Sequence, residues 1–347
     1  MFLHFRHSVC LPCLAMAAIL AAMATLVLPP SIASAAAGPP VVWVLRSMER
    51  IGPADAPGAN TRAQIWAARG ESESFQIAVR AAGGNLTGVN VTMSDLTTAS
   101  GARIAAESFT LYREHFAQVT KSSPDWGGSN RPLGPGWYPD GLIPFRDPAT
   151  GRDLSGAALD AAPFAVAAGA NQVVWVDLLV PRTAAPGTYT GEYTVTSDQG
   201  TASGTVELRV WNFTLPVQPS LKSSFQFGQA GSAQARAELL RHRLMPLQAP
   251  LAEEPSLVRD YGLNATHLGY WSGADYNSCT MSPAPPVSEL LGKANAHDDR
   301  LALYNYTADE IGRCASLFPR MKEWARNLHA AGVKNLVTMS PVAELMD

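Results

Sequence analysis

Residues 41–217 alternate between apolar and polar positions at the two-residue period of β-strands. Tyr193 and Val195 alternate with polar residues, and Val206 and Val210 continue the pattern in the next run. Successive side chains of a strand point to opposite faces, so each run has one buried face and one face in water. The runs are short, rich in valine, threonine and aromatic residues, and bounded by glycine and proline. This pattern predicts an N-terminal antiparallel β-sandwich.

Beyond residue 219 the pattern changes to helix-like runs separated by short apolar runs. The helix-like runs begin at Ser232, Pro285 and Ser316. In the last of them, apolar residues recur at spacings of three and four, which predicts the buried stripe of an amphipathic helix. The strand-like runs are apolar on both faces and read SSFQF, ATHLGYW, RLALYNY and VKNLVTM. Strands and helices in alternation predict a parallel sheet covered by helices.

Two adjacent acids, Asp309 and Glu310, end one of these runs in the stretch RLALYNYTADEIG. In parallel α/β folds, active sites lie at the carboxyl ends of strands, because the following loops converge there. Consecutive side chains of a strand diverge, so both acids can serve one pocket only if the backbone leaves extended geometry beside them, and Gly312 permits such a turn. Two carboxylates in one pocket cannot ionise independently, so one can keep a proton as general acid beside an anionic neighbour. Glycoside hydrolysis requires this division of roles.

A second interpretation of the same pair stays open. Asp309 could begin the next helical segment as an N-cap, and Glu310 could favour the positive end of the helix dipole. Both acids would then serve the structure of the segment and take no part in chemistry.

Six stretches of the chain form an ordered set: RGESESFQIAVRA, WYPDGLIPF, VWVDLLVPRTAAPGTYTGEYTV, LRVWNFTLPVQPSLKSSF, RHRLMP and YNYTADE. With them the chain resembles glycoside hydrolase family 123, bacterial β-N-acetylgalactosaminidases, and the related secreted proteins described as domain of unknown function 4091. The resemblance implies a retaining, substrate-assisted hydrolysis of glycans that contain β-linked N-acetylhexosamine, above all N-acetylgalactosamine. It makes Glu310 the acid that protonates the glycosidic oxygen. It makes Asp309 the carboxylate that orients the 2-acetamido group, whose carbonyl oxygen attacks the anomeric carbon. The family's pair is usually followed by proline, where this chain has Ile311.

The resemblance also implies that residues 219–347 belong to a (β/α)8 TIM-type barrel. A complete barrel takes about 250 residues, and this segment offers strands one to five at most. The expected fold class is therefore multidomain β plus α/β, with the β-sandwich domain over residues 41–217 followed by a partial barrel. We expect a C-terminally truncated member of the family. The alternative functions are carbohydrate binding or surface adhesion without hydrolysis, and an inactive fragment of a longer glycosidase.

Aromatic side chains are candidates for sugar stacking, because sugar rings present apolar C–H faces to flat rings. Trp137 and Tyr138 lie in a long loop rich in proline and glycine, and loops of that length are often functional. Tyr270 and Trp271 close one strand-like run, and with Tyr306 they could form a sugar-binding wall. Packing against the loop or within the core is the alternative for each ring.

Residues 1–35 have the pattern of a secretory signal peptide. A basic start at Arg6 precedes an apolar run from Leu14 to Leu28 and a small-residue site that ends at Ala35. The apolar run is shorter than the roughly 20 residues of a spanning helix. We therefore expect a secreted, periplasmic or cell-surface protein with no membrane span after cleavage.

Cys279 and Cys314 are the cysteines that remain after cleavage. In an oxidising compartment they could form a disulfide that closes a loop of about 36 residues and contributes about 3 to 4 kcal/mol, or they could remain two thiols. The net charge of −3 lacks the basic excess that nucleic acid binding requires. The sequence contains no motif for a metal, a phosphate loop or an organic cofactor. The expected partner is a glycan or glycoconjugate, and the oligomeric state is left open.

Overall fold

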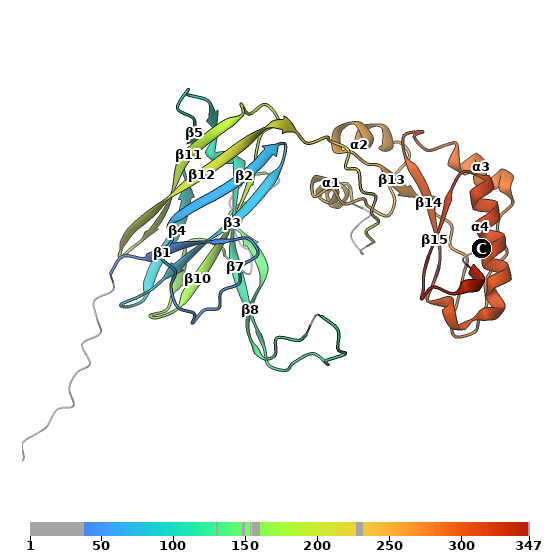
Figure 1. Ribbon diagram of the computed structural model, residues 1–347, viewed down its shortest axis with the longest axis horizontal. Helices are drawn as coiled ribbons and strands as arrows, with labels where there is room; N and C mark the ends of the chain where they lie inside the picture. Colours follow the sequence, from blue (N-terminus) through green and yellow to red (C-terminus); the bar gives the residue numbers. More distant parts are fainter. Residues whose placement is uncertain are drawn as a thin grey trace, which may run out of the picture.

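The structure is a computed structural model that describes residues 38–129, 131–147, 150–152, 154, 160–226 and 232–345. Figure 1 shows two lobes, a larger one of strands and a smaller one of helices and strands. The chain is mostly β, with several antiparallel pairings and few helices. Among the described residues, no helix combines the length and the apolar character needed to cross a membrane. The expected signal peptide, residues 1–35, lies outside the described residues.

Two β-sheets make up the larger lobe. Sheet A has the order β1-β3-β10-β7-β8, and sheet B has the order β2-β12-β11-β4-β9, with short β5 and β6 beside β11. The strands are β1 (Val41–Arg46), β2 (Arg62–Arg69), β3 (Ser72–Arg80), β4 (Leu86–Met93), β5 (Leu96–Thr97), β6 (Arg103–Ile104), β7 (Phe109–Val119), β8 (Gly136–Pro144), β9 (Phe164–Val166), β10 (Asn171–Leu179), β11 (Gly187–Ser197) and β12 (Gly200–Thr214).

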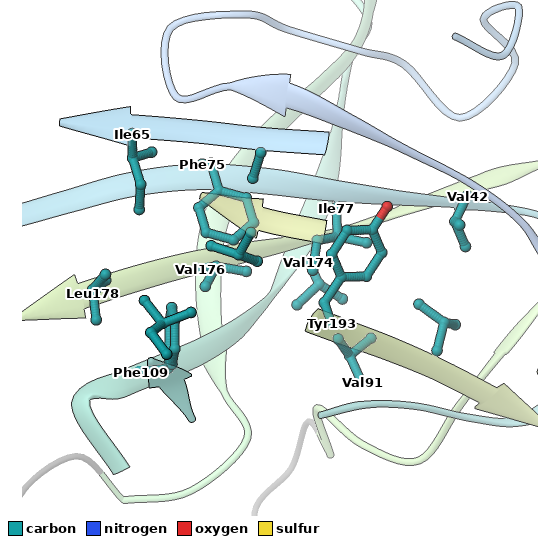
Figure 2. Close-up of a cluster of buried hydrophobic side chains, with 14 of the residues drawn as sticks. Val42, Ile65, Phe75, Ile77, Val91, Phe109, Val174, Val176, Leu178 and Tyr193 are labelled. Atoms are coloured by element: carbon teal, nitrogen blue, oxygen red, sulfur yellow. The ribbon is translucent and has the colours of Figure 1, made fainter. Parts of the chain in front are cut away.

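The two sheets pack face to face on one hydrophobic core, shown in Figure 2. Ile77 and Val174 of sheet A and Ile65 and Tyr193 of sheet B are each less than 9% exposed. Full burial of one such side chain contributes roughly 1.5 to 3 kcal/mol. The predicted alternation in β11 and β12 is confirmed, because Tyr193, Val195, Val206 and Val210 are buried while the polar residues between them are exposed or half-buried.

One pairing in sheet B differs from the expected antiparallel sandwich. β2 runs parallel to β12, with Ile65 opposite Leu208, whereas the pairings of sheet A are antiparallel. The two-residue period predicts which face of a strand is buried, but strand direction depends on the neighbour, which lies far away in the sequence.

The smaller lobe contains a parallel sheet in the order β13-β14-β15. In Figure 1, α3 and α4 lie along one side of it. Buried apolar side chains, among them Leu268 of the segment after β13, Leu290 of α3 and Trp324 of α4, form one cluster there. The elements are α1 (Ala233–Arg241), α2 (Glu254–Tyr261), β13 (Ala265–His267), α3 (Val287–Ala294), β14 (Ala302–Asp309), α4 (Phe318–Ala330) and β15 (Lys334–Thr338).

The helix predictions are confirmed in part. Met321, Trp324 and Leu328 of α4 are buried as the spacing predicted, and the helix-like run from Ser232 begins as predicted, because the Ser232 side chain accepts a hydrogen bond from the backbone N–H of Ala235 at 3.1 Å. The sequence interpretation missed α2. The strand expected over ATHLGYW is only three residues long, because Gly269 has a φ of 94° and takes the backbone out of extended geometry.

Backbone hydrogen bonds link two further segments to the β13 edge of the parallel sheet. The backbone N–H of His267 donates to the carbonyl oxygen of Leu247, and the N–H of Leu247 donates to the carbonyl oxygen of Phe225, both at 2.9 Å. Phe225 and Pro246 form an isolated parallel bridge. The predicted strand SSFQF is therefore a single bridge among its described residues, and the segments of Phe225 and Leu247 lie beside the β13 edge of the three-stranded sheet.

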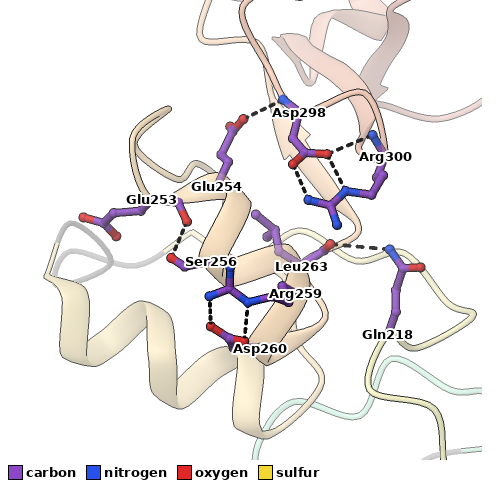
Figure 3. Close-up of polar contacts among 9 residues, drawn as sticks. All are labelled: Gln218, Glu253, Glu254, Ser256, Arg259, Asp260, Leu263, Asp298 and Arg300. Carbon is purple, nitrogen blue, oxygen red and sulfur yellow. Dashed lines mark hydrogen bonds and ion pairs between the residues drawn. The ribbon is translucent and has the colours of Figure 1, made fainter.

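Polar contacts fix the turn before β14, as Figure 3 shows. The buried carboxylate of Glu254 accepts from the backbone N–H of Asp298 at 3.0 Å and contacts His297 Nδ1 at 2.7 Å. Asp298 in turn binds the guanidinium of Arg300 through both carboxylate oxygens. These contacts anchor the amino end of β14 to α2.

Candidate functional site

Asp309 and Glu310 lie at the carboxyl end of β14, the central strand of the parallel sheet, and both are exposed. The backbone leaves extended geometry at Glu310, which has φ 49° and ψ 28°. This left-handed conformation is uncommon for a residue with a Cβ atom, and it clusters at functional sites. The turn that the sequence required beside the acids therefore occurs at Glu310 itself and not at Gly312.

A β-bulge in β14 sets the direction of the Asp309 side chain. Tyr306 pairs with Leu336, yet Asp309 pairs with Thr338, so three steps along β14 match two steps along β15. One extra residue in a strand reverses the alternation beyond it. Tyr306 and Asp309 consequently share the face of the sheet on which Leu336 and Thr338 lie.

Thr338, at the end of β15, connects the site residues through hydrogen bonds. Its hydroxyl donates to Asp309 Oδ1 and lies 2.7 Å from the Tyr306 hydroxyl. Because a threonine has one hydroxyl hydrogen and a carboxylate accepts, the Tyr306 O–H is the donor to Thr338. Burial raises the pKa of Tyr306, and the nearby charges of Asp309 and Glu310 add to this. The sequence interpretation missed Thr338, although its place at the end of the next strand could have indicated it.

Helix capping does not account for the pair. The 3-10 turn that follows, Ile311–Arg313, has Glu310 at its N-cap position, and the Glu310 side chain makes no capping hydrogen bond. α4 begins only at Phe318 and has Leu317 at its N-cap. Asp309 instead accepts from Thr338. Of the two interpretations of these acids, the N-cap therefore has no support from the contacts.

The segment after the acids is fastened to the loop after β13. Cys279 and Cys314 form a disulfide, which confirms one of the two expected states. Arg313 donates to the carbonyl oxygen of Tyr276 at 2.9 Å and to Asn277 Oδ1 at 3.0 Å. These contacts lie within four residues of Glu310, so they hold the turn in which that residue stands.

Three of the predicted sugar-binding rings lie at this end of the sheet. The rings of Trp271 and Tyr306 have centroids 6.0 Å apart at 45°, and Trp271 is 54% exposed. Tyr270 is held by its hydroxyl, which donates to Glu289 Oε1 at 2.9 Å, and by Lys293 Nζ 4.4 Å above its ring. Trp271 and Tyr306 thus leave ring surface beside Asp309, whereas Tyr270 is engaged with α3.

The other two predicted rings, Trp137 and Tyr138, lie in β8 of the larger lobe. Figure 1 shows β8 and the loop before it well apart from β14 and β15. Trp137 borders a cavity of about 280 Å³ with Phe116, and the Tyr138 hydroxyl donates to the carbonyl oxygen of Gly134 at 2.9 Å. The structure therefore does not bring these two rings to the acids.

His267 is a buried polar residue on the face of the sheet that carries Tyr304. Its ring centroid lies 5.7 Å from that of Tyr304, and neither ring nitrogen has a hydrogen-bond partner among the described residues. Burial lowers the pKa of His267, so the ring is neutral at pH 7. Nothing in the sequence alone distinguished this histidine from a core residue.

Across the described ranges, no three histidine, cysteine or acidic side chains gather where they could hold a metal ion. The site offers two carboxylates, a tyrosine, a threonine and an exposed indole. These groups can exchange protons, orient a polar group and stack on a ring.

Residues 49–197 match the family model described as glycoside hydrolase 123 N-terminal domain. The larger lobe is therefore similar to a glycoside hydrolase 123 N-terminal domain. The matched segment runs through most of the sandwich and ends before the smaller lobe, so the chain is family 123-like on the evidence of its sandwich. No curated protein matches the sequence.

Among solved structures, the chain is similar to a family 123 glycoside hydrolase from Clostridium perfringens, studied for glycolipid glycan hydrolysis. The identity is 13% and the TM-score 0.45, over 66% of this chain and 37% of that one. This chain therefore spans little more than a third of that enzyme's chain. A second similar structure is AvmM, described as catalysing macrocyclization in alchivemycin A biosynthesis, with 9% identity and a TM-score of 0.27 over 51% of this chain and 91% of that one.

Proposed function

We propose that the chain is a secreted glycoside hydrolase that cleaves β-linked N-acetylhexosamine, with N-acetylgalactosamine as the preferred sugar. The observation that carries the proposal is the position of Asp309 and Glu310 at the carboxyl end of the central parallel strand, with Glu310 in a left-handed turn. Active sites of parallel α/β folds occupy this position. The family 123 sandwich that precedes the sheet supports a glycoside as the substrate.

In the proposed reaction, Glu310 is the general acid and Asp309 orients the 2-acetamido group of the sugar. The acetamido carbonyl oxygen attacks the anomeric carbon, the bond to the glycosidic oxygen breaks, and Glu310 gives its proton to that oxygen. Positive charge then grows on the acetamido nitrogen, and the carboxylate of Asp309 stabilises it. Water adds to the anomeric carbon as Glu310 takes up its proton, so the product retains the β configuration.

The contacts of Asp309 suit this role. A carboxylate that orients a substrate group has to be held by its own partners, and the Thr338 hydroxyl provides one bond to Oδ1. The Tyr306 hydroxyl completes the chain of donors behind it. The Glu310 side chain has no hydrogen bond or ion pair with any residue that the structure describes, so it is free to meet a leaving group.

The smaller lobe is proposed to be the first part of a (β/α)8 barrel. The three parallel strands, with two hydrogen-bonded segments beside β13, support this, as does the packing of α3 and α4 on one face. On the opposite face Leu336 is 39% exposed and Tyr306 half-buried. In a barrel, that face is the interior and its carboxyl end holds the site.

Secretion is proposed on two grounds. The first is the signal-like pattern of residues 1–35. The second is the Cys279–Cys314 disulfide, since such bonds persist mainly outside the cytosol.

Hydrolysis of 4-nitrophenyl N-acetyl-β-galactosaminide by the purified chain, with the product followed by NMR, tests the proposal. The β anomer of N-acetylgalactosamine should appear first, and 4-nitrophenyl β-galactoside, which lacks the acetamido group, should remain intact. Equal hydrolysis of both substrates would rule out the acetamido mechanism, and an initial α anomer would rule out retention. Glycan binding without any hydrolysis would favour the carbohydrate-binding alternative.

A further inference from the structure

Three large aromatic side chains are exposed together on the outer face of sheet B. Trp66 of β2 is 53% exposed, and Trp211 and Phe213 of β12 are 42% and 53% exposed. We call these three residues the aromatic strip. They lie in the larger lobe, and none of them belongs to the site at the end of β14.

The register of β2 and β12 places the two indoles side by side. Trp66 pairs with Arg209, and Trp211 follows Arg209 by two residues, so both tryptophans are on the same face. With strands about 4.8 Å apart and about 6.6 Å between alternate residues, their Cβ atoms are separated diagonally by about 8 Å. The inward neighbours Ala67 and Val210 are buried, which confirms that the rings point away from the core.

A bulge extends the strip toward the end of β12. Val210 pairs with Ala67, but Thr214 pairs with Arg69, so four steps along β12 match two along β2. Trp211, Asn212 and Phe213 are all exposed as a result. Bulges often redirect side chains at functional surfaces.

The surroundings of the strip are polar and carry charges of both signs, with Arg62 and Arg209 on the same face as Glu192 and Glu207. Arg62 and Glu207 form an ion pair, and Gln64 also donates to Glu207 at 3.3 Å. Arg209 donates to the Thr188 hydroxyl at 3.2 Å. The next strand, β11, carries threonines on the outer face at positions 188, 190, 194 and 196. Flat rings with a border of hydroxyl and amide groups match an uncharged polyhydroxylated ligand better than an ionic or an aliphatic one.

The area of the strip is too small for a stable protein interface. An aromatic side chain contributes about 150 to 250 Å², so three half-exposed rings offer on the order of 300 Å², against roughly 800 Å² per partner in a standard interface. A second copy of this chain would therefore not be held by the strip. A glycan chain needs only a few stacked rings and lateral hydrogen bonds.

We propose that the aromatic strip binds a neutral glycan chain, whose sugar rings stack on Trp66 and Trp211 while their hydroxyl groups meet Gln64 and the threonines of β11. The indole Nε1 groups of both tryptophans have no hydrogen-bond partner among the residues described, so they are available as donors. This binding site is independent of hydrolysis at Glu310. It would hold the protein on a polysaccharide surface.

Native affinity electrophoresis of the full chain through gels that contain galactomannan, xyloglucan or mixed-linkage β-glucan tests this proposal. At least one glycan should retard the wild type, and W66A and W211A should each lose most of that retardation. The matched control is W126A, which removes an exposed tryptophan elsewhere in the same lobe and should migrate like the wild type. Far-UV circular dichroism of each variant, together with thermal unfolding, verifies the fold.

Three results would overturn the proposal. One is the absence of retardation by all three glycans, and another is retardation of W66A and W211A equal to that of the wild type. The third is a dimer in sedimentation experiments that W211A dissolves, which would assign the strip to a second copy. Because all these readouts measure binding, the E310Q variant should be retarded like the wild type, and this separates the strip from the hydrolase function.

Discussion

The backbone N–H of Glu310 donates to the carbonyl oxygen of Thr338 at 2.7 Å, although Glu310 stands in a left-handed conformation with φ 49°. The end of β15 thus holds the turned residue by its backbone and leaves its side chain free. Thr338 also donates its hydroxyl to Asp309. One residue of the neighbouring strand therefore positions both acids.

Replacement of Thr338 by valine should lower kcat for an N-acetyl-β-galactosaminide about tenfold. The substitution keeps the shape but removes the hydroxyl bond to Asp309 and to Tyr306. A tenfold loss corresponds to about 1.4 kcal/mol, near the lower end of what a hydrogen bond to a charged group contributes. KM should change little, and T338S should restore the rate. A T338V variant with wild-type kcat would show that Thr338 does not position Asp309.

The E310G variant should be more stable than the wild type. Glycine adopts left-handed φ values without steric cost, whereas a residue with a Cβ atom is destabilised there by about 1 to 2 kcal/mol. Glycine also has more conformational freedom in the unfolded chain, and this reduces the net stabilisation of the variant. We expect a net increase of about 0.5 to 1 kcal/mol in the free energy of unfolding, measured by urea denaturation. The control is D309G, in which the same change at an extended strand position should be destabilising. A less stable E310G would contradict a strained backbone at Glu310.

Loss of the disulfide should destabilise the smaller lobe. Cys279 and Cys314 are 35 residues apart in sequence, and a loop of this length contributes about 3 to 4 kcal/mol through the entropy of the unfolded chain. The double variant C279S/C314S should therefore unfold at a clearly lower urea concentration than the wild type. Dithiothreitol should lower the midpoint of the wild type toward that of the variant and leave the variant unchanged. An equal midpoint for all forms would mean that the bond adds nothing to stability.

The stability of the sandwich should fall as the pH rises from about 5 to about 7. Glu114 of β7 is 4% exposed, and its Oε2 has no partner among the described residues. Burial raises the pKa of Glu114 from 4.5 to about 7. Below pH 4.5 the Glu114 carboxyl is protonated in both the folded and the unfolded chain. Between pH 4.5 and about 7 it is protonated only in the folded chain. Each unit of pKa difference corresponds to about 1.36 kcal/mol, so the stabilisation lost across this window is on the order of 2 to 3 kcal/mol.

The E114Q variant should lack this dependence, because an amide does not ionise. Thermal unfolding at pH 5, 6, 7 and 8 provides the measurement. E107Q, a change at an exposed carboxylate in the same lobe, should keep the slope of the wild type. If E114Q and the wild type lose stability in parallel, another group is responsible.

The sequence predicted the parts of the structure that depend on local periodicity. The buried face of α4 and the alternation of β11 follow directly from spacing, because a helix and a strand repeat their faces every 3.6 and every two residues. α2 also carried local signals, with Pro255 in its first turn and Gly262 in the left-handed conformation at its end. These two residues mark the start and the end of a helix over this segment.

The features that depend on distant neighbours could not be predicted in this way. The bulge that turns Asp309 toward Tyr306 exists only in the register with β15. The separation of Trp137 from the acids depends on how the lobes are arranged, which no local pattern encodes. Likewise Trp66 and Trp211, 145 positions apart in the sequence, become neighbours only because β2 pairs with β12.

The most direct test of the central claim is the initial rate of 4-nitrophenol release from 4-nitrophenyl N-acetyl-β-galactosaminide by the wild type, E310Q and D299N. Asp299 lies before β14 at the opposite end of the strand, so its variant controls for the loss of a carboxylate from the same lobe. If Glu310 is the general acid, E310Q should lose about 10²- to 10⁴-fold in kcat/KM, while D299N keeps the rate of the wild type. An E310Q variant as active as the wild type would contradict the assignment of this site.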